Sequence, residues 1–255
     1  MSSAELAAAP SLPALKMPKT WKFFGTTLWG VGAFAAMSIA QMAAILIAFG
    51  FLVRGEFDED ILAAFANHGA TLAGSVLVGM PAALLVLWLA TCTARRSFAS
   101  YLALRRPTPG QIVCALVASV ALLAMLDGLS WLFGYPLSPD FVLASVRTAR
   151  DSGLIWLLVL GFCVGAPIAE EFIFRGFLFR GWSATFLGPT GAIVLSAVVF
   201  AVIHLQYAWF YIAGVAMVGL LFGYLRHRSG STWLTVIAHG FYNLMATVQA
   251  WWIIS

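Results

Sequence analysis

The chain has 255 residues, of which 62% are hydrophobic and only 9% are charged, and its formal net charge is +4. Soluble domains carry about 25% charged residues, because a folded surface has to face water. This composition excludes a soluble globular domain and predicts an all-α transmembrane helical bundle in a lipid bilayer. Nucleic-acid binding is not indicated, since Lys and Arg stand in short clusters beside apolar runs, the pattern of membrane topology signals.

Residues 1–22 contain Ala, Ser and Pro and end in three lysines, and we expect them to form a flexible basic lead. A cleaved signal peptide is the alternative. It is disfavoured because the apolar stretch from Phe23 to Val53 is much longer than the core of a signal peptide, which has about 7–15 residues. The remainder, 23–255, is predicted to be a single transmembrane bundle.

Apolar runs of about 20 residues, the length that crosses a bilayer core of about 30 Å, recur through this part of the chain. They predict about seven membrane helices, at roughly 26–53, 70–92, 111–134, 154–182, 190–206, 209–225 and 232–253. The tract 190–225 also allows a different division, with an eighth helix that is re-entrant or interfacial. The sequence contains no internal repeat, Gly-rich phosphate loop or appended soluble domain.

The positions of the basic residues predict the orientation in the membrane. Seven spans with a cytoplasmic N-terminus place on the inner side Lys16, Lys19, Lys22, Arg95, Arg96, Arg105, Arg106, Arg175, Arg180, Arg226 and Arg228. The same arrangement places outside only Arg54, Arg147 and Arg150. The positive-inside rule favours this orientation. Short loops and a basic inner face are typical of a bacterial inner (plasma) membrane.

Several ionisable side chains interrupt the apolar spans, namely Asp127, Glu170, Glu171, Arg175, His204 and His239, with Asn243 as a polar companion. A charged residue at the bilayer centre costs at least about 2.5–3.5 kcal/mol on insertion scales, so its presence indicates a function. All except Asp127 lie in the fourth, fifth and seventh predicted spans. We assign Asp127, which stands apart, to a structural hydrogen bond or an aqueous vestibule.

The fourth span contains two adjacent carboxylates. Glu171 and Arg175 are spaced i,i+4 and are predicted to pair on one helix face, whereas Glu170 lies about 100° around the helix and keeps no such partner. Two carboxylates in different surroundings tend to take different roles in acid–base chemistry. Pro167 removes a backbone hydrogen bond and predicts a kink or helix start near Glu170. A charge cluster that anchors the helix end is the alternative.

The other two spans each contain one pair at i,i+4 spacing. Phe200 lies one turn before His204, and His239 lies one turn before Asn243, with Gly240 allowing a close approach between helices. Interhelical hydrogen bonds explain each pair taken alone. Together the three spans supply a carboxylate and an imidazole that can activate water, and donors for an oxyanion, which are the groups that hydrolysis needs.

The ordered motifs Glu-Glu-x-x-x-Arg, Phe-x-x-x-His and His-x-x-x-Asn resemble the CAAX-processing and bacteriocin-processing enzyme family (CPBP), intramembrane proteases also called Abi or CAAX prenyl endopeptidase-like proteins. The resemblance covers roughly 150–250, which would form the protease core. It implies that Glu170 activates water with assistance from His204. Glu171 and Arg175 would form a supporting ion pair, and His239 and Asn243 would bind the oxyanion.

The family is often labelled metalloprotease, and Glu170, His204 and His239 make a chemically reasonable zinc set. The sequence has no His-Glu-x-x-His motif, and we favour a glutamate-activated water without metal or other cofactor. We expect the substrate to be a peptide or a membrane-anchored protein; prenylation and oligomeric state stay open. The alternatives are a transporter with a proton relay, and a non-catalytic scaffold or immunity protein.

Overall fold

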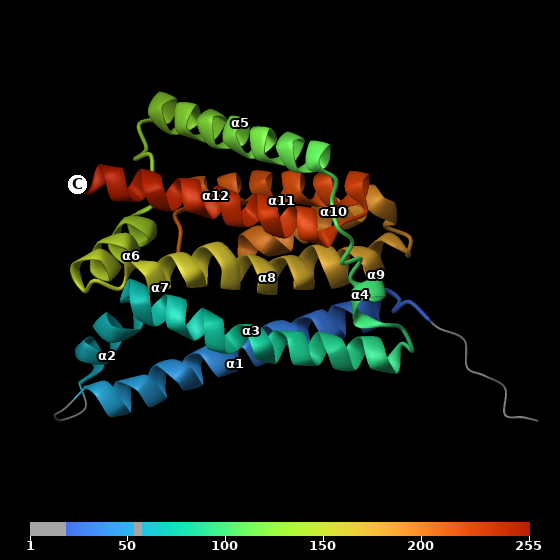
Figure 1. Ribbon diagram of the computed structural model, residues 1–255, viewed down its shortest axis with the longest axis horizontal. Helices are drawn as coiled ribbons and strands as arrows, with labels where there is room; N and C mark the ends of the chain where they lie inside the picture. The colour runs from blue at the N-terminus through green and yellow to red at the C-terminus, as the bar shows by residue number, and fades with distance from the viewer. Residues whose placement is uncertain (1–18, 54–57) are drawn as a thin grey trace, which may run out of the picture.

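The computed structural model describes residues 19–53 and 58–255, and within them every regular element is helical. Most of the predicted lead, together with Arg54, lies outside the described residues. The helical runs long and apolar enough to cross a membrane are α1 (Phe23–Leu52), α3 (Gly69–Thr93), α5 (Pro109–Phe133), the run Ile155–Ser183 and α11 (Trp209–Ser229). Together with α10 (Gly188–Val202) and α12 (Thr232–Ile253) they form a layered bundle (Figure 1). The predicted all-α polytopic fold is confirmed, and the chain is an integral membrane protein.

Two of the predicted span boundaries are wrong by four residues. α10 ends at Val202 and not at 206, so His204 lies in the turn after the helix. α11 continues to Ser229, where Gly230 adopts a left-handed conformation with φ 66° and ends the helix, so Arg226 lies in its last turn and not in a loop. Hydropathy could not mark the end of α10, because Ile203 and Leu205 beyond it are also apolar.

Short helices in the connecting segments were not predicted. They are α2 (Glu59–Ala66), α4 (Phe98–Tyr101) and α6 (Asp140–Asp151). α6 begins with an acidic residue and ends near Arg150, which suits the helix dipole. Its buried residues Val146 and Ala149 pack in one cluster with residues of α3, α12 and the run Ile155–Ser183. It therefore covers one end of the bundle.

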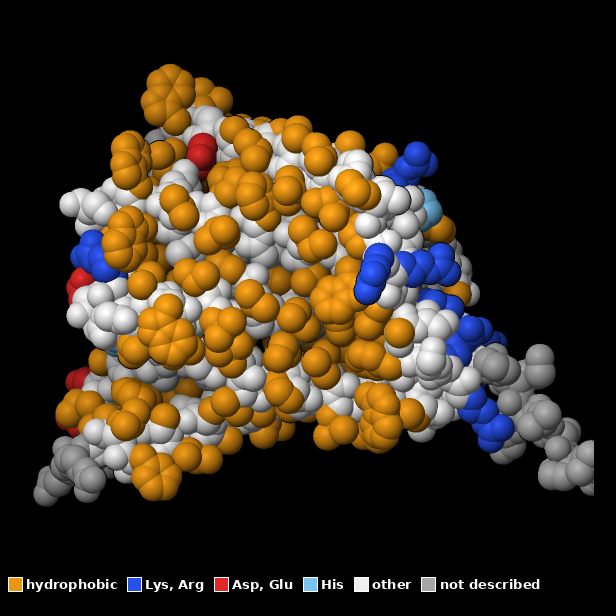
Figure 2. Space-filling view, viewed as in Figure 1, with side chains coloured by type: hydrophobic (Ala, Val, Ile, Leu, Met, Phe, Trp, Pro, Cys, Tyr) orange, Lys and Arg blue, Asp and Glu red, His pale blue; other side chains and the backbone are white. Residues whose placement is uncertain are grey.

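Of the described basic residues predicted to share one side, all except the buried Arg175 lie toward one end of the molecule, which we call the arginine-rich end. Arg180 Nη1 donates to the backbone oxygen of Ser100 at 2.8 Å, and Arg96 Nε donates to that of Lys19 at 3.1 Å. Figure 2 shows Lys and Arg side chains gathered there. That this end faces the cytoplasm stays a prediction.

The opposite end carries α2, α6 and the C-terminus (Figure 1). There the backbone N–H of Gly69 donates to Thr148 Oγ1 at 2.9 Å, and Arg150 Nη1 donates to the backbone oxygen of Ile254 at 3.0 Å. These bonds tie the start of α3 and the end of α12 to α6. Successive long helices thus run alternately between the two ends, as the predicted topology requires.

The run Ile155–Ser183 is the centre of the bundle. Half of the residues in its most apolar stretch are buried, whereas only 11% are buried in the corresponding stretch of α1. It consists of α7 (Ile155–Leu160), the π-helical segment η1 (Gly161–Gly165), α8 (Ala166–Glu171), the π-helical segment η2 (Phe172–Leu178) and α9 (Phe179–Ser183). Pro167 lies in the first turn of α8, directly after η1. The predicted kink or helix start is thus realised as a change of backbone hydrogen-bond register within a continuous helix.

Two glycines let neighbouring helices touch at their backbones. A Cβ atom on Gly240 of α12 would lie 2.5 Å from the carbonyl oxygen of Cys163 in η1. One on Gly219 of α11 would lie 2.9 Å from Cα of Ala197 in α10. The close approach predicted for Gly240 is confirmed, and it brings His239 and Asn243 against the central run.

Candidate active site

The Glu171–Arg175 ion pair lies at the junction of α8 and η2, and both side chains are fully buried. Arg175 Nη1 lies 2.7 Å from Glu171 Oε1, and Arg175 Nη2 donates to the backbone oxygen of Gly219 at 3.1 Å. Burying either charge alone would be expensive, so each side chain requires the other. The spacing i,i+4 brings the pair together as the sequence predicts.

Aromatic rings enclose the guanidinium group of Arg175. Its Cζ atom lies 4.7 Å from the ring centroid of Phe200, 5.6 Å from that of Phe222 and 5.8 Å from that of Phe174. The guanidinium group is weakly hydrated and stacks on aromatic faces, which makes arginine suited to a dry site. Phe200 of the Phe-x-x-x-His motif therefore contacts the ion pair as well as the His204 ring, whose centroid lies 4.8 Å away.

His239 connects the ion pair to the second carboxylate. Its Nδ1 lies 2.9 Å from Glu171 Oε1, and its Nε2 lies 3.8 Å from Glu170 Oε2. Because Glu171 is paired with Arg175, it is a carboxylate and accepts a hydrogen bond from Nδ1 of His239. Nδ1 therefore carries the ring proton, and Nε2 is the nitrogen that can interact with water or substrate. The separation of 3.8 Å is too long for a hydrogen bond and allows a water molecule to bridge the two atoms.

The two adjacent carboxylates differ in their surroundings. The Glu170 side chain is 19% exposed, whereas that of Glu171 is fully buried. Glu171 is held by Arg175 and His239, while Glu170 faces a cavity. The difference predicted from their positions around the helix is therefore present, and Glu170 is the carboxylate that a ligand can reach.

His204 caps the C-terminal end of α10. Its Nδ1 lies 2.7 Å from the backbone oxygen of Phe200, a carbonyl at the helix end with no partner in the helix ladder. A carbonyl oxygen only accepts, so Nδ1 carries the proton and Nε2 is free, as in His239. The ring of Tyr207 stacks at 5.8 Å from that of His204. The structure gives no direct hydrogen bond between His204 and Glu170 in the described part of the chain.

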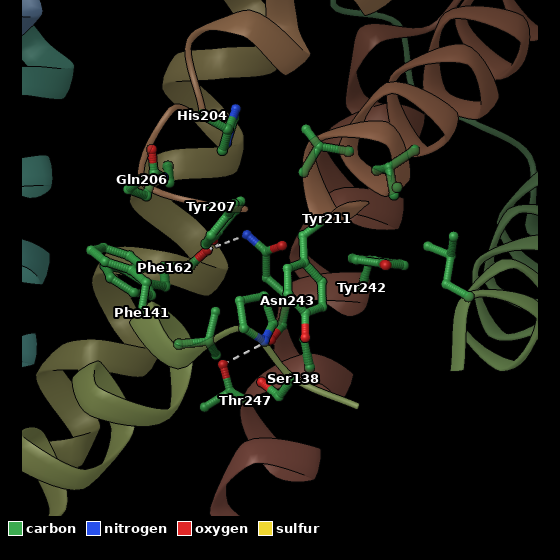
Figure 3. Close-up of a pocket in the computed structure, with 18 of the residues that line it drawn as sticks. Ser138, Phe141, Phe162, His204, Gln206, Tyr207, Tyr211, Tyr242, Asn243 and Thr247 are labelled. Atoms are coloured by element: carbon green, nitrogen blue, oxygen red, sulfur yellow. Dashed lines mark hydrogen bonds between the residues drawn. The ribbon is translucent and has the colours of Figure 1, made fainter. Parts of the chain in front are cut away.

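Asn243 is held by the central run. Its Nδ2 donates to the backbone oxygen of Phe162 in η1 at 2.8 Å, and Thr247 Oγ1 donates to the backbone oxygen of Asn243 at 2.8 Å (Figure 3). An amide carries two N–H donors, so one remains available. The side chain is therefore fixed in position and still able to donate to a ligand.

A cavity of about 510 Å³ connects these groups. Its walls include Glu170, His204, His239 and Asn243, whereas Glu171 and Arg175 lie behind them. Figure 3 shows part of the wall, including His204, Tyr207, Asn243 and Ser138. Pro139 and Gln206, in segments at the opposite end, also line the cavity, which therefore extends away from the arginine-rich end. The volume is in the range of small-molecule and peptide-side-chain sites.

Residues 152–245 match the family model described as Type II CAAX prenyl endopeptidase Rce1-like. This match confirms the resemblance stated from the motifs, and we call 152–245 the Rce1-like segment. It contains α7 to α11, α12 as far as Met245 and every residue of the three motifs.

One curated relative is the UPF0177 protein YbdI of Lactococcus lactis subsp. lactis (strain IL1403), which is 31% identical over 93 residues. The aligned part is 36% of this chain and spans about half of the relative, 49% of its length. No solved structure matches the chain. The family model that matches this segment is described as one of prenyl endopeptidases.

The alternative zinc set of Glu170, His204 and His239 can be tested on the arrangement of these side chains. Only Glu170 and His239 come close to each other, at 3.8 Å between Oε2 and Nε2. Among the residues that the structure describes, no group of three or more His, Cys, Asp or Glu side chains is placed to hold a metal ion. The three residues as arranged do not fit a zinc centre, and we derive no step through a metal.

Sequence reasoning missed Arg226 as a part of the site. This residue is 6% exposed, and its Nε donates to the backbone oxygen of Arg175 at 3.0 Å and to Thr232 Oγ1 at 3.1 Å. It fixes the backbone that carries the buried ion pair. In the sequence it is indistinguishable from the neighbouring Arg228, which marks the membrane boundary.

Proposed function

We propose that this protein is an intramembrane endopeptidase that hydrolyses a peptide bond with an activated water. The observation that carries the proposal is the position of Glu170 Oε2 and His239 Nε2, 3.8 Å apart on the cavity wall, where a water molecule can lie between them. The buried pair behind them supports this role, because Glu171 orients His239. The Rce1-like segment supports a peptidase of the CAAX type.

In the proposed reaction, Glu170 accepts a proton from the water held between it and His239. The water oxygen forms a bond to the carbonyl carbon, and the remaining N–H of Asn243 donates to the oxyanion that develops. Glu170 then returns the proton to the amine nitrogen as the C–N bond breaks. This assignment makes His239 rather than His204 the partner of Glu170 in positioning water.

His204 receives a different role in this proposal from the one expected from the motif order. Its Nδ1 proton is committed to the Phe200 carbonyl, so Nε2 can donate only from the imidazolium form. We propose that this imidazolium form donates a hydrogen bond to the carbonyl oxygen of the substrate, as Asn243 does, since both residues line the cavity. His204 thereby takes the oxyanion-binding role that the resemblance gives to His239.

We also propose that the substrate approaches from the outer face of a bacterial inner membrane. The cavity extends to segments at the opposite end, and the positive-inside rule places the arginine-rich end in the cytoplasm. A peptide or a membrane-anchored protein with a scissile bond near the outer surface fits this arrangement.

The test is peptide-substrate profiling in proteoliposomes with wild type and Glu170→Gln. The variant keeps the size of the side chain and removes the base, so hydrolysis should fall by roughly 10²–10⁴-fold while peptide binding persists. Glu59→Gln, the same substitution on exposed α2, is the matched control. Full cleavage by Glu170→Gln would refute the mechanism, and an ion-flux assay on the same vesicles tests the proton-relay alternative.

A further inference from the structure

A second polar group lies in the wall of the same cavity, on the side away from the arginine-rich end. Asp127 of α5 accepts a hydrogen bond at Oδ2 from Gln249 Nε2 of α12, at 2.8 Å, and both residues line the cavity. The predicted structural hydrogen bond of Asp127 is therefore present. The proposed water activation at Glu170 uses neither residue, although a carboxylate in a membrane-spanning helix is expensive to retain.

The hydrogen bond fixes which atoms of the pair face a ligand. A carboxylate only accepts, so the amide of Gln249 turns its NH₂ group to Asp127 and its Oε1 away from it. No described residue donates a hydrogen bond to Asp127 Oδ1 or Gln249 Oε1. Two oxygens from two helices are thus left as acceptors at one place in the cavity wall.

The charges of the cavity point to the same class of ligand. Its walls contain the acids Asp127 and Glu170 against the imidazolium proposed for His204, and among the described residues that line it there is no Lys or Arg. A carboxylate in a largely apolar wall attracts an ammonium or guanidinium group, which supplies three to five donors. The geometry and the charge therefore agree.

We propose that Asp127 and Gln249 form a binding subsite for a cationic side chain, Lys or Arg, of the peptide substrate. The proposal rests on the proposed peptidase function and adds a specificity to it. Gln249 follows His239 by ten positions on α12, which corresponds to about 15 Å along the helix. An extended peptide covers that length with about four or five residues, so the cation should lie at that distance from the cleaved bond.

The test measures binding rather than cleavage, so that it stands apart from the test of the peptidase function. Glu170→Gln in nanodiscs of phosphatidylcholine, which has no net charge, is titrated with apolar fluorescent peptides that carry one Lys, norleucine or Glu at successive positions. We expect Lys to bind tightest at one position. Adding Asp127→Asn should lower the affinity for the Lys peptide roughly tenfold more than the affinity for the norleucine peptide, because hydrogen bonds to charged groups are strong.

Asp140→Asn, at an exposed acid at the start of α6, is the matched control for general attraction of cations to this end. Equal weakening of the Lys and norleucine peptides by Asp127→Asn would show that the pair only joins α5 to α12. Equal effects of Asp127→Asn and Asp140→Asn, or no preference for Lys at any position, would also overturn the subsite. Absence of peptide cleavage by the wild-type protein would instead contradict the proposed peptidase function and leave the binding result unaffected.

Discussion

Replacing Glu171 by methionine is expected to destabilise the protein, because it leaves the Arg175 guanidinium buried without a counter-charge. Glu171 Oε1 takes part in an ion pair at 2.7 Å and accepts from His239 at 2.9 Å. Hydrogen bonds to charged groups contribute about 1.5–3 kcal/mol each, and removing one partner of a buried pair costs about 3–5 kcal/mol. Since Arg175 keeps the Gly219 carbonyl and the Phe200 ring, we expect a loss of about 3 kcal/mol.

A second substitution, Arg175→Met, removes the stranded charge and separates stability from catalysis. Apolar side chains of similar volume in place of a buried ion pair are often neutral or stabilising, so the double variant should recover most of the lost stability. Cleavage should stay at least about 10²-fold below wild type, because His239 Nδ1 has lost its acceptor and the ring its orientation.

The assay is thermal melting in detergent together with peptide cleavage for wild type, both single variants and the double variant. The four proteins form a double-mutant cycle, which isolates the coupling between the two side chains. A double variant that regained cleavage along with stability would refute the argument that Glu171 positions His239. A Glu171→Met variant that melted like wild type would refute the energetic role of the pair.

Four further predictions concern the oxyanion, the helix contact, the metal and the orientation. Asn243→Ala should lower kcat by about 10²–10³-fold, as for a lost oxyanion donor, while the lost hydrogen bond to the Phe162 carbonyl should cost only about 1 kcal/mol of stability. Gly240→Ala places a methyl group 2.5 Å from the carbonyl oxygen of Cys163, and chemical unfolding should report a loss of about 1–3 kcal/mol. A chelator titration with zinc add-back should leave cleavage unchanged, whereas abolition and recovery would establish a metal. Ser100→Cys should react with a membrane-impermeant thiol reagent only from the cytoplasmic side; labelling from outside would contradict the orientation.

The long helices could be predicted because the bilayer imposes both their length and their apolar composition. α12 has the predicted bounds, and Ser231 supplies a side-chain cap at its start. α6 could not be found in this way, since it buries only Val146, Ala149 and one serine on a helix that also carries charges. The end of α10 was also hidden, because the hydrogen bond from His204 to the Phe200 carbonyl is a local event without a hydropathy signal.

The buried ion pair could be predicted because both partners belong to one helix, where spacing alone determines proximity. Which histidine lies beside Glu170 depends instead on how α12 packs against α8, and the sequence does not specify that packing. The contact of Gly240 with η1 brings His239 to the two carboxylates, while His204 remains at the end of α10. For the same reason the pairing of Asp127 with Gln249, which are 122 positions apart, was not foreseeable.

The π-helical segments on both sides of Glu170 and Glu171 restrict how this stretch can change in evolution. Backbone hydrogen bonds in η1 and η2 span five residues, whereas those of an α-helix span four. Deleting one residue from Gly161–Gly165 would let the backbone return to the α-helical register, in which the carbonyls of this turn point along the helix axis to backbone donors. The Phe162 carbonyl would then no longer face Asn243. Homologous proteins that keep this site should therefore differ here by substitutions and not by insertions or deletions.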